Sequence, residues 1–432
     1  MEIIEAQWVL PVEPWTVIEN GAVAVEEGRI ADVGPAAEVR ARNPHATVRA
    51  LGAVALLPGL VNAHTHAAMT LLRGYADDVP LMSWLNDRIW PAESRWVDPG
   101  FVTDGTLLAA AEMLTGGVTT FADMYFFPSA AIEACGQAGI RVMSGQVIVE
   151  GATAYGAGPD DYLHKAQEVV AAYRDVPLVH FSVAPHAPYT VSDTTLARAV
   201  ELADQWDVPL NIHVHETRDE IEQSLAQYGQ RPLARMDRLG AVNRRLLAAH
   251  AVHLTDDEIA LLAERGCALV HCPASNLKLA SGMARFADWL SSGIRVGVGT
   301  DGPASNNRLD LLADLRLASL LAKVVSDDAA VVPARQALHT ATLGGAQALG
   351  LADRIGSLTV DKEADMIAVD LGAWQSQPLY DVASHLVYAT APGAVREVWV
   401  AGRLRVSDGS LVDLDPAALA AIARQWGSRI AG

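Results

Sequence analysis

The sequence is poor in cysteine and has no long apolar runs. Three cysteines, Cys135, Cys267 and Cys272, occur in 432 residues without a C-x-x-C pair. This excludes a disulfide framework and a cysteine-based zinc knot, and it suits a reducing compartment. No run approaches the roughly 18 apolar residues of a membrane-spanning helix, and the N-terminus lacks a basic segment followed by an apolar signal core. We therefore expect a cytoplasmic protein.

Positive charge is also scarce. The chain has 32 basic and 51 acidic residues, which gives a formal net charge of −19. This balance works against nucleic acid and anionic membranes as partners and favours small neutral or cationic ligands. Only four of the basic residues are lysines, namely Lys165, Lys278, Lys323 and Lys362, and none of them ends an early strand-like run.

Apolar residues make up 51% of the chain, which is enough to form one large core and a smaller one. Between residues 58 and 363, strand-like runs alternate with helical stretches. These runs include "GVTTFADMY", "RVMSGQVIV", "LVHFSVAPH", "PLNIHVHET", "LLAAHAVHL", "CALVHCPAS" and "RVGVGTDGP". So many βα units in one span predict an α/β fold, a (β/α)8 TIM-type barrel, over residues 58–363.

The two ends of the chain have a different character. Residues 1–57 and 364–432 carry short β-like runs separated by turns, as in "GAVAVEEGRIADVGP" and "VREVWVAGRLRVSDGSLV". The segment "DPAALAAIARQWGSRI" predicts a terminal helix that starts at Asp415 or Pro416. We expect both ends to form one small composite β-sandwich domain beside the barrel.

Polar residues follow the strand-like runs of the expected barrel. The first example is "LLPGLVNAHTHAAMTLLRG", in which His64 and His66 can face the same side of a strand and converge on a metal ion. The others are Asp123, His186, His213 with His215 and Glu216, His250 with His253, His271, and Asp301. One such histidine is more often structural, but their repetition at strand ends predicts an active-site pocket, because the carboxyl ends of barrel strands meet there.

These residue types suit hydrolytic metal chemistry. Three imidazoles and the Asp301 carboxylate fit zinc or a similar divalent ion and leave room for a water that ionises near neutral pH. Spacing alone leaves His213 and His215 as alternatives for one ligand position, because both face the same way on a strand. Glu216 could be a proton shuttle or a solvated carboxylate that pairs with Arg218.

His250 could polarise the water on the metal ion or the oxyanion that forms during the reaction. A protonated Asp301 could do the same.

Five ordered motifs carry a resemblance that covers nearly the whole chain. "PGLVNAHTHAAMTLLRG", "HVHET", "AAHAVHL", "HCPASNLKLASG" and "GTDGPASNN" together resemble the amidohydrolase superfamily. Within it they are similar to the aminohydrolases that deaminate adenosine derivatives, typified by 5′-methylthioadenosine/S-adenosylhomocysteine deaminases. Such enzymes serve purine and methylthio salvage.

The resemblance implies a site with one metal ion. Its ligands would be His64, His66, His213 and Asp301, with Glu216 as acid and base, His250 beside the nucleophile and His215 as a neighbour that does not bind the ion. Relatives with two metal ions bridge them with a carboxylated lysine at an early strand end, and this chain has none there. We expect one divalent ion, zinc in the first place and iron or manganese as alternatives.

Two further segments resemble those that recognise a nucleoside. In "LRGYADDVPLMSWLNDRIWPAE", Glu93 matches the carboxylate that binds ribose hydroxyls and Trp84 an apolar wall. In "APHAPYT", His186 would hydrogen-bond the sugar or purine. Ser305 or Asn306 would contact the base or fix its loop. Glu93 could instead be an acidic residue on a surface helix, and Asn306 could simply stabilise a turn.

The loop "GQVIVEGATAYGAGPDDY" bears on the substrate. Similar enzymes place basic residues there to bind the carboxylate of a homocysteine group, and this loop has no arginine or lysine. We therefore expect deamination of 5′-methylthioadenosine, or adenosine, although Arg73, Arg88 or a neighbouring subunit could supply the missing charge. Dimers or tetramers are usual among similar enzymes, so a homo-oligomer is expected.

Three alternatives stay open for the function. They are an S-adenosylhomocysteine-preferring deaminase, a hydrolase of guanine or a triazine, and a non-catalytic binding protein. The first two share the metal site and differ in the pocket loops.

Overall fold

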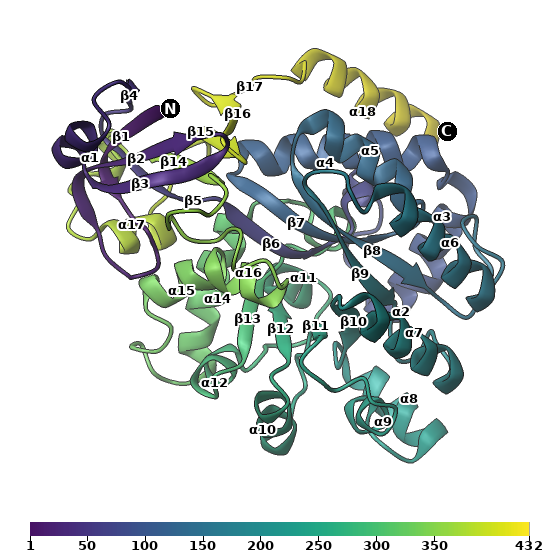
Figure 1. The fold of residues 1–432 in the computed structure, drawn as a ribbon. Helices are drawn as coiled ribbons and strands as arrows, with labels where there is room; N and C mark the ends of the chain where they lie inside the picture. Colours follow the sequence, from purple (N-terminus) through teal and green to yellow (C-terminus); the bar gives the residue numbers. More distant parts are fainter. Residues whose placement is uncertain (432) are drawn as a thin grey trace.

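Eight parallel strands form the centre of the molecule in a computed structural model that describes residues 1–431 (Figure 1). Each strand pairs with the next one in chain order, which confirms the expected (β/α)8 barrel. The strands are β6 (Leu60–Thr65), β7 (Val118–Tyr125), β8 (Arg141–Ile148), β9 (Val179–Pro185), β10 (Leu210–Val214), β11 (Leu246–His250), β12 (Ala268–His271) and β13 (Arg295–Val298). Beyond β13 the Asp301 amide donates to the His64 carbonyl at 3.0 Å, which brings the last strand back to the first.

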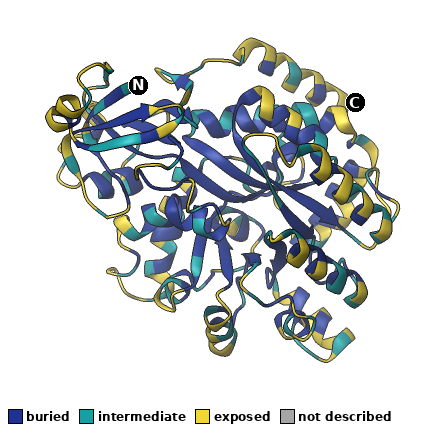
Figure 2. Cartoon of the chain, in the orientation of Figure 1, coloured by how far each residue is buried: buried dark blue, intermediate teal, exposed yellow. Residues whose placement is uncertain are grey.

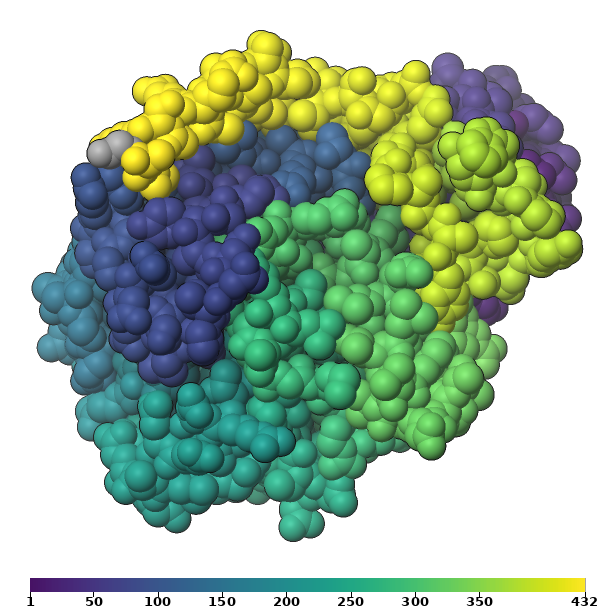
Figure 3. All heavy atoms as spheres, turned by 180° about the vertical axis from the view of Figure 1, so that it is seen from behind, coloured from purple at the N-terminus to yellow at the C-terminus, as the bar shows by residue number. Residues whose placement is uncertain are grey.

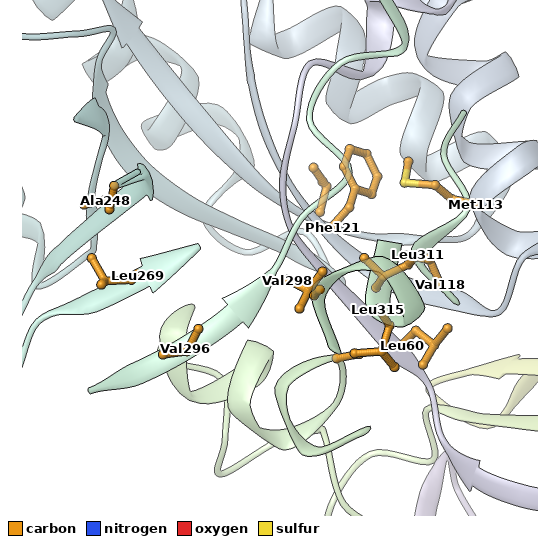
Figure 4. Packing of buried hydrophobic residues seen from close by; sticks show 14 of the residues in the cluster. Leu60, Met113, Val118, Phe121, Ala248, Leu269, Val296, Val298, Leu311 and Leu315 are labelled. Carbon is orange, nitrogen blue, oxygen red and sulfur yellow. The ribbon is translucent and has the colours of Figure 1, made fainter. Parts of the chain in front are cut away.

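Helices surround the barrel and leave its strands buried (Figures 1 and 2). All eight residues of β7 and all eight of β8 are buried, as expected for parallel strands covered on both faces. The helices of the ring are α4 (Pro99–Thr115), α5 (Pro128–Ala138), α6 (Pro159–Tyr173), α7 (Asp193–Trp206), α8 (Arg218–Tyr228), α9 (Pro232–Arg238), α10 (Asp256–Glu264), α11 (Pro273–Lys278), α12 (Phe286–Ser291), α13 (Pro303–Asn306) and α14 (Leu311–Val325). Figure 4 shows Met113 of α4 and Leu311 and Leu315 of α14 beside Leu60, Val118 and Val298 of the strands.

Both chain ends contribute strands to a second, nine-stranded sheet. The two ends meet where β5 pairs with β14, with Leu57 opposite Ile367. Its strands are β1 (Glu2–Val9), β2 (Ile18–Glu26), β3 (Arg29–Pro35), β4 (Thr47–Ala50), β5 (Val54–Pro58), β14 (Met366–Asp370), β15 (Val395–Val400), β16 (Arg403–Ser407) and β17 (Ser410–Leu411), with α1 (Ala36–Arg42) against it. The domain limits at 57/58 and 363/364 stay a prediction.

The remaining elements lie in the connection from β6 to α4 and after the last barrel strand. The connection from β6 to α4 contains η1 (Ala67–Leu72), α2 (Leu81–Ser83), the π-helical turn η2 (Trp84–Ile89) and α3 (Trp90–Trp96). After the barrel come α15 (Ala334–Thr340), α16 (Leu343–Ala348), η3 (Trp374–Ser376), α17 (Val382–Tyr388) and α18 (Pro416–Ala431). Helix α18 begins where the sequence predicted and contacts α4 and η1.

The absences noted in the sequence concern membrane-spanning helices and disulfide bonds. No helix within residues 1–431 is long and apolar enough to cross a membrane. The three cysteines are buried and free, and no two of them form a disulfide.

A buried ion cluster ties the barrel to the second sheet. Arg141, fully buried at the start of β8, donates from Nη2 to Glu363 Oε2 at 2.6 Å and to Asp365 Oδ1 at 2.9 Å. Arg354 donates to the other oxygen of Glu363 at 2.8 Å, and Asp365 Oδ1 also accepts from the Ala401 amide at 2.7 Å. Removing Arg141 would leave the buried Asp365 carboxylate without its arginine, while Glu363 would keep Arg354.

Replacing Arg141 with alanine is therefore expected to lower the free energy of unfolding by about 3–5 kcal/mol, the range for a broken buried ion pair. Urea denaturation followed by circular dichroism measures this. Arg244→Ala, which removes an exposed ion pair with Asp207, is the control and should change little. Equal small effects of the two substitutions would contradict the assigned role of the cluster.

Candidate active site

Four side chains converge at the carboxyl ends of the barrel strands. His64 is in β6, His66 follows that strand, His213 is in β10 and Asp301 follows β13. His213 Nε2 lies 3.2 Å from His64 Nε2 and 3.3 Å from His66 Nε2. Asp301 Oδ1 lies 3.6 Å from His64 Nε2 and 3.3 Å from His66 Nε2. These are the four residues that the sequence predicted as metal ligands.

The backbone sets the orientation of two of the imidazoles. His66 Nδ1 is 2.6 Å from the Met124 carbonyl and His213 Nδ1 is 2.6 Å from the His186 carbonyl. Because a carbonyl only accepts, each Nδ1 carries a proton, so a neutral ring at either position presents the lone pair of its Nε2 to the cluster. Lone pairs and a carboxylate at such short distances repel one another unless a cation lies between them.

The donor set fits a divalent ion. A tetrahedral ion about 2.1 Å from each ligand separates the ligand atoms by about 3.4 Å, which matches the distances of 3.2 to 3.6 Å found here. Imidazole and carboxylate ligands suit zinc and leave other divalent ions possible. His64 and His213 also lie within ligand distance of His250.

Burial prepares these groups to bind a cation. It lowers the pKa of His64 to about 4 and that of His213 well below its usual value, so both rings stay neutral, as a metal ligand requires. Burial by itself would raise the pKa of Asp301, but contacts with His64 and His66 outweigh it and hold that pKa well below normal.

Asp301 is held in place from behind. The hydroxyls of Ser275 and Ser305 donate to its Oδ2 at 2.6 and 2.7 Å, which leaves Oδ1 to face His64 and His66. Its φ of 60° is in the left-handed region, as is the φ of 69° at His250. Such backbone strain collects at functional sites.

Glu216 and His250 flank the ligand cluster. Glu216 follows β10, is buried, and has its Oε2 atom 4.0 Å from His250 Nε2. Burial raises the pKa of Glu216, which favours a carboxyl group that can carry a proton. His250 Nδ1 contacts Asn276 Oδ1 at 2.9 Å, so Nδ1 carries the proton and Nε2 faces the pocket.

His215 points away from this cluster. Its Nε2 accepts a hydrogen bond from the Leu233 amide at 3.2 Å, and its Nδ1 lies 3.4 Å from Arg231 Nη2. The geometry therefore separates the two alternatives that strand spacing left open, because only His213 reaches His64 and His66.

A cavity of about 680 Å³ opens above the ligand cluster. His66, His213, Glu216, His250 and Asp301 form its floor. Trp84, Glu93, His186, Tyr125 and residues 149–154 form its walls. Among residues 1–431 no lysine or arginine lines it, and Arg73 instead pairs with Glu112.

Glu93 faces this cavity together with Tyr125. Burial raises the pKa of Tyr125 well above normal, so its hydroxyl keeps the proton and donates to Glu93 Oε1 at 2.7 Å. Burial also raises the pKa of Glu93, to about 7. Glu93 is only 8% exposed, so it is not the surface acid that was the structural alternative for this residue.

Comparison with known proteins places this geometry in a family. The model of the amidohydrolase family matches residues 55–405, and that of an imidazolonepropionase-like composite domain of bacteria matches residues 21–46. The chain belongs to the amidohydrolase family. A 5-methylthioadenosine/S-adenosylhomocysteine deaminase of Teredinibacter turnerae is 43% identical over 99% of this chain and 97% of its own length.

Solved structures agree with this membership. A zinc-bound adenosine deaminase from Xanthomonas campestris is 49% identical, covers 100% of this chain and 98% of its own, and superposes with a TM-score of 0.97. Zinc-bound atrazine chlorohydrolase from Arthrobacter aurescens is 25% identical over 99% and 100% of the two chains, with a TM-score of 0.92. The expected family is confirmed, and this amidohydrolase is a hydrolytic enzyme that acts on C–N bonds.

Several predicted residues of this amidohydrolase lie outside the cavity wall. Ser305 donates to Asp301, and Asn306 Nδ2 donates to the Thr300 carbonyl at 2.7 Å and to Asp314 Oδ2 at 2.8 Å. His253 contacts the Ser281 carbonyl, and His271 packs against Phe286 and Trp289.

Three residues with roles around the site did not stand out in the sequence: Ser275, Asn276 and Tyr125. Ser275 and Asn276 lie within the "HCPASN" motif, four and five residues after His271. Tyr125 ends β7, two residues after Asp123. Their positions, at the end of β7 and in the helix that follows β12, were the available signal.

Asp301→Ala is expected to lower both metal content and activity, because it removes one of four ligands and leaves three neutral histidines. Elemental analysis of metal per chain measures the first effect. His164→Ala, at an exposed histidine of α6, is the control. Full metal occupancy in the Asp301 variant would show that it is not a ligand.

Proposed function

We propose that this amidohydrolase deaminates an adenine nucleoside with an uncharged 5′ substituent. Its substrate would be 5′-methylthioadenosine or adenosine, converted with water to the inosine analogue and ammonia. The observation that carries this proposal is a cavity that joins the histidine cluster and Glu216 to Glu93 and that no lysine or arginine of the described chain lines. The names of the relatives support the same reaction class.

One divalent ion would be held by His64, His66, His213 and Asp301. Zinc is our first choice, because the ligand types suit it and two similar structures contain it. When bound, such an ion lowers the pKa of water and so provides a nucleophile near neutral pH.

Glu216 would move the protons. Its raised pKa allows it to accept a proton from water and deliver it to the purine ring nitrogen beside the amine-bearing carbon. The hydroxide that remains adds to that carbon, which has become electrophilic. His250 Nε2 and Asp301 would lie beside the tetrahedral carbon and help to move the second proton from the added hydroxyl to the exocyclic amine. The C–N bond then breaks, ammonia leaves, and the oxygen stays as the carbonyl of the inosine analogue.

Glu93 and its neighbours would bind the nucleoside. As a carboxylate, Glu93 accepts two hydrogen bonds from ribose hydroxyls while Tyr125 holds it in place. Trp84 would form an apolar wall, and its buried Nε1 has no partner within residues 1–431. His186 lines the same cavity and would bind the sugar or purine. Ser305 would act behind Asp301 rather than on the substrate.

The charge of the cavity opposes a homocysteine group. Glu93, Glu150, Glu216 and Asp301 line it, with no cation to pair with a substrate carboxylate in the described chain. Burying such a carboxylate unpaired costs several kcal/mol. This supports methylthioadenosine or adenosine over S-adenosylhomocysteine. The cytoplasmic location and the homo-oligomer stay predictions.

A substrate panel tests this proposal. We expect zinc-loaded enzyme to release ammonia from methylthioadenosine and adenosine with kcat/KM values at least about tenfold above those for S-adenosylhomocysteine. Guanine and a triazine complete the panel. Activity confined to the two free heterocycles would overturn the nucleoside proposal, and a preference for S-adenosylhomocysteine would overturn the argument from charge.

Glu216→Gln is expected to fold, bind metal normally and lose at least about a hundredfold in kcat, because it removes the proton carrier. Glu222→Gln, an exposed residue of α8, is the matched control. Turnover close to that of the control would remove Glu216 from the mechanism.

The pKa of Glu93 predicts a pH-dependent KM. Because its pKa is raised to about 7, the carboxyl is ionised above that pH and protonated below it. KM for methylthioadenosine should therefore rise as the pH falls below 7, approaching about tenfold per pH unit. The Glu93→Gln variant should have a high KM without this dependence. The same pH profile in both enzymes would assign the titration to another group.

A further inference from the structure

Helix α18 is largely exposed, yet it places one tryptophan in the molecule's interior. Trp426 is 6% exposed, and its Nε1 donates to Asp104 Oδ2 at 2.7 Å. Its ring meets Phe101 edge to face, with centroids 5.3 Å apart. Leu419 is the other buried residue of this helix. The C-terminal helix is therefore anchored on the start of α4.

The same helix reaches the end of α3. The Arg429 guanidinium lies 4.5 Å from the ring centroid of Trp426 and 5.4 Å from that of Trp96. Arg95 also lies over the Trp96 ring, at 4.4 Å. Cations above aromatic rings attract them, so Arg429 links α18 to the last residue of α3.

Helix α3 also carries Glu93, one turn before Trp96. The Val97 amide donates to the Glu93 carbonyl at 3.0 Å, and the Val97 side chain lines the cavity beside Glu93. Movement of Trp96 would therefore move the carboxylate that faces the substrate.

One hydrophobic cluster contains both sides of this contact. Trp426 belongs to it together with Trp84, Leu85, Ile89 and Tyr125, which line the cavity. Trp96, Ile422 and Ile430 pack against its edge. Figure 3 shows the yellow C-terminal helix along the dark blue part of the chain, and Figure 1 shows the C-terminus beside α3. The outer support of the cavity wall thus comes from the far end of the sequence.

We propose that α18 positions the nucleoside-binding wall. Trp426 and Arg429 hold Trp96, and through α3 they keep Glu93 against Tyr125 and directed into the cavity. They are positioning residues, because neither touches the cavity. This inference rests on the proposed role of Glu93 in binding ribose.

Trp426→Ala and Arg429→Ala, assayed as full-length, metal-loaded enzyme with methylthioadenosine, test it. We expect Trp426→Ala to raise KM about tenfold, the order of effect of a misplaced binding group, with kcat within about twofold and metal content unchanged. Arg429→Ala should raise KM less. Trp426→Phe keeps the ring in the cluster and should restore a KM near that of the wild type. Arg424→Ala, an exposed arginine on the same helix, is the matched control.

A double-mutant cycle shows whether the effect passes through Glu93. In a Glu93→Gln background, Trp426→Ala should add little to KM, because the group that it positions is already lost. Full additivity would overturn the proposal, as would a KM unchanged by Trp426→Ala while Glu93→Gln raises it. A loss confined to kcat, with KM constant, would indicate general destabilisation and overturn it too.

Hydrogen exchange of the α3 amides separates this proposal from the proposed function. Trp426→Ala should speed exchange in residues 90–96, and Arg424→Ala should not. Unchanged exchange overturns the bracing role regardless of what Glu93 does. Faster exchange combined with a normal KM in Glu93→Gln would show that α18 braces α3 but that the ribose role of Glu93 is wrong, which overturns the assignment to substrate binding.

Discussion

The site depends on the close approach of three imidazole nitrogens and one carboxylate at the barrel mouth. With neighbouring donors 3.2 to 3.6 Å apart, this arrangement is unfavourable unless a cation neutralises it. The barrel provides the constraint, because the Asp301 amide, just beyond the end of β13, donates to the His64 carbonyl within β6. Backbone carbonyls then fix His66 and His213, and two serines fix Asp301. Three of the four side chains, His66, His213 and Asp301, are thus oriented by hydrogen bonds from their far sides.

The wall of the cavity is built differently from the histidine cluster at its floor. Glu93 and Trp84 lie in the connection between β6 and α4, which leaves the barrel and returns to it, and residues 149–154 lie in another loop. Loops on a rigid barrel are where related enzymes vary specificity. A loop segment needs outside support to hold a carboxylate in place, and here Tyr125 supports Glu93 from inside while α18 packs outside α3.

The cavity and the protein as a whole both carry an excess of acidic groups. The chain carries a net charge of −19, and the cavity wall repeats that sign with four carboxyl groups and no cation in the described chain. Burial offsets part of this charge by raising the pKa values of Glu93 and Glu216. A proton on Glu216 would serve the proposed proton transfer, whereas a proton on Glu93 would weaken its capacity to accept hydrogen bonds. The same physical effect therefore helps one carboxyl and limits the other.

Strand alternation and ordered motifs in the sequence were enough to predict the barrel, the family and the residues that gather at the barrel mouth. Strand periodicity decides which side chains share a face, and ordered motifs at strand ends bring His64, His66, His213, Glu216 and Asp301 to one mouth. Strand spacing left His213 and His215 as alternatives, the family motifs favoured His213, and the structure separates the two rings by their contacts. Only the tertiary structure shows that Ser305 lies behind Asp301 and that Tyr125 pairs with Glu93. It alone placed Trp426 on Asp104 and Arg429 beside Trp96. Such contacts join segments more than 300 residues apart, and no local pattern encodes them because they depend on how separate helices pack.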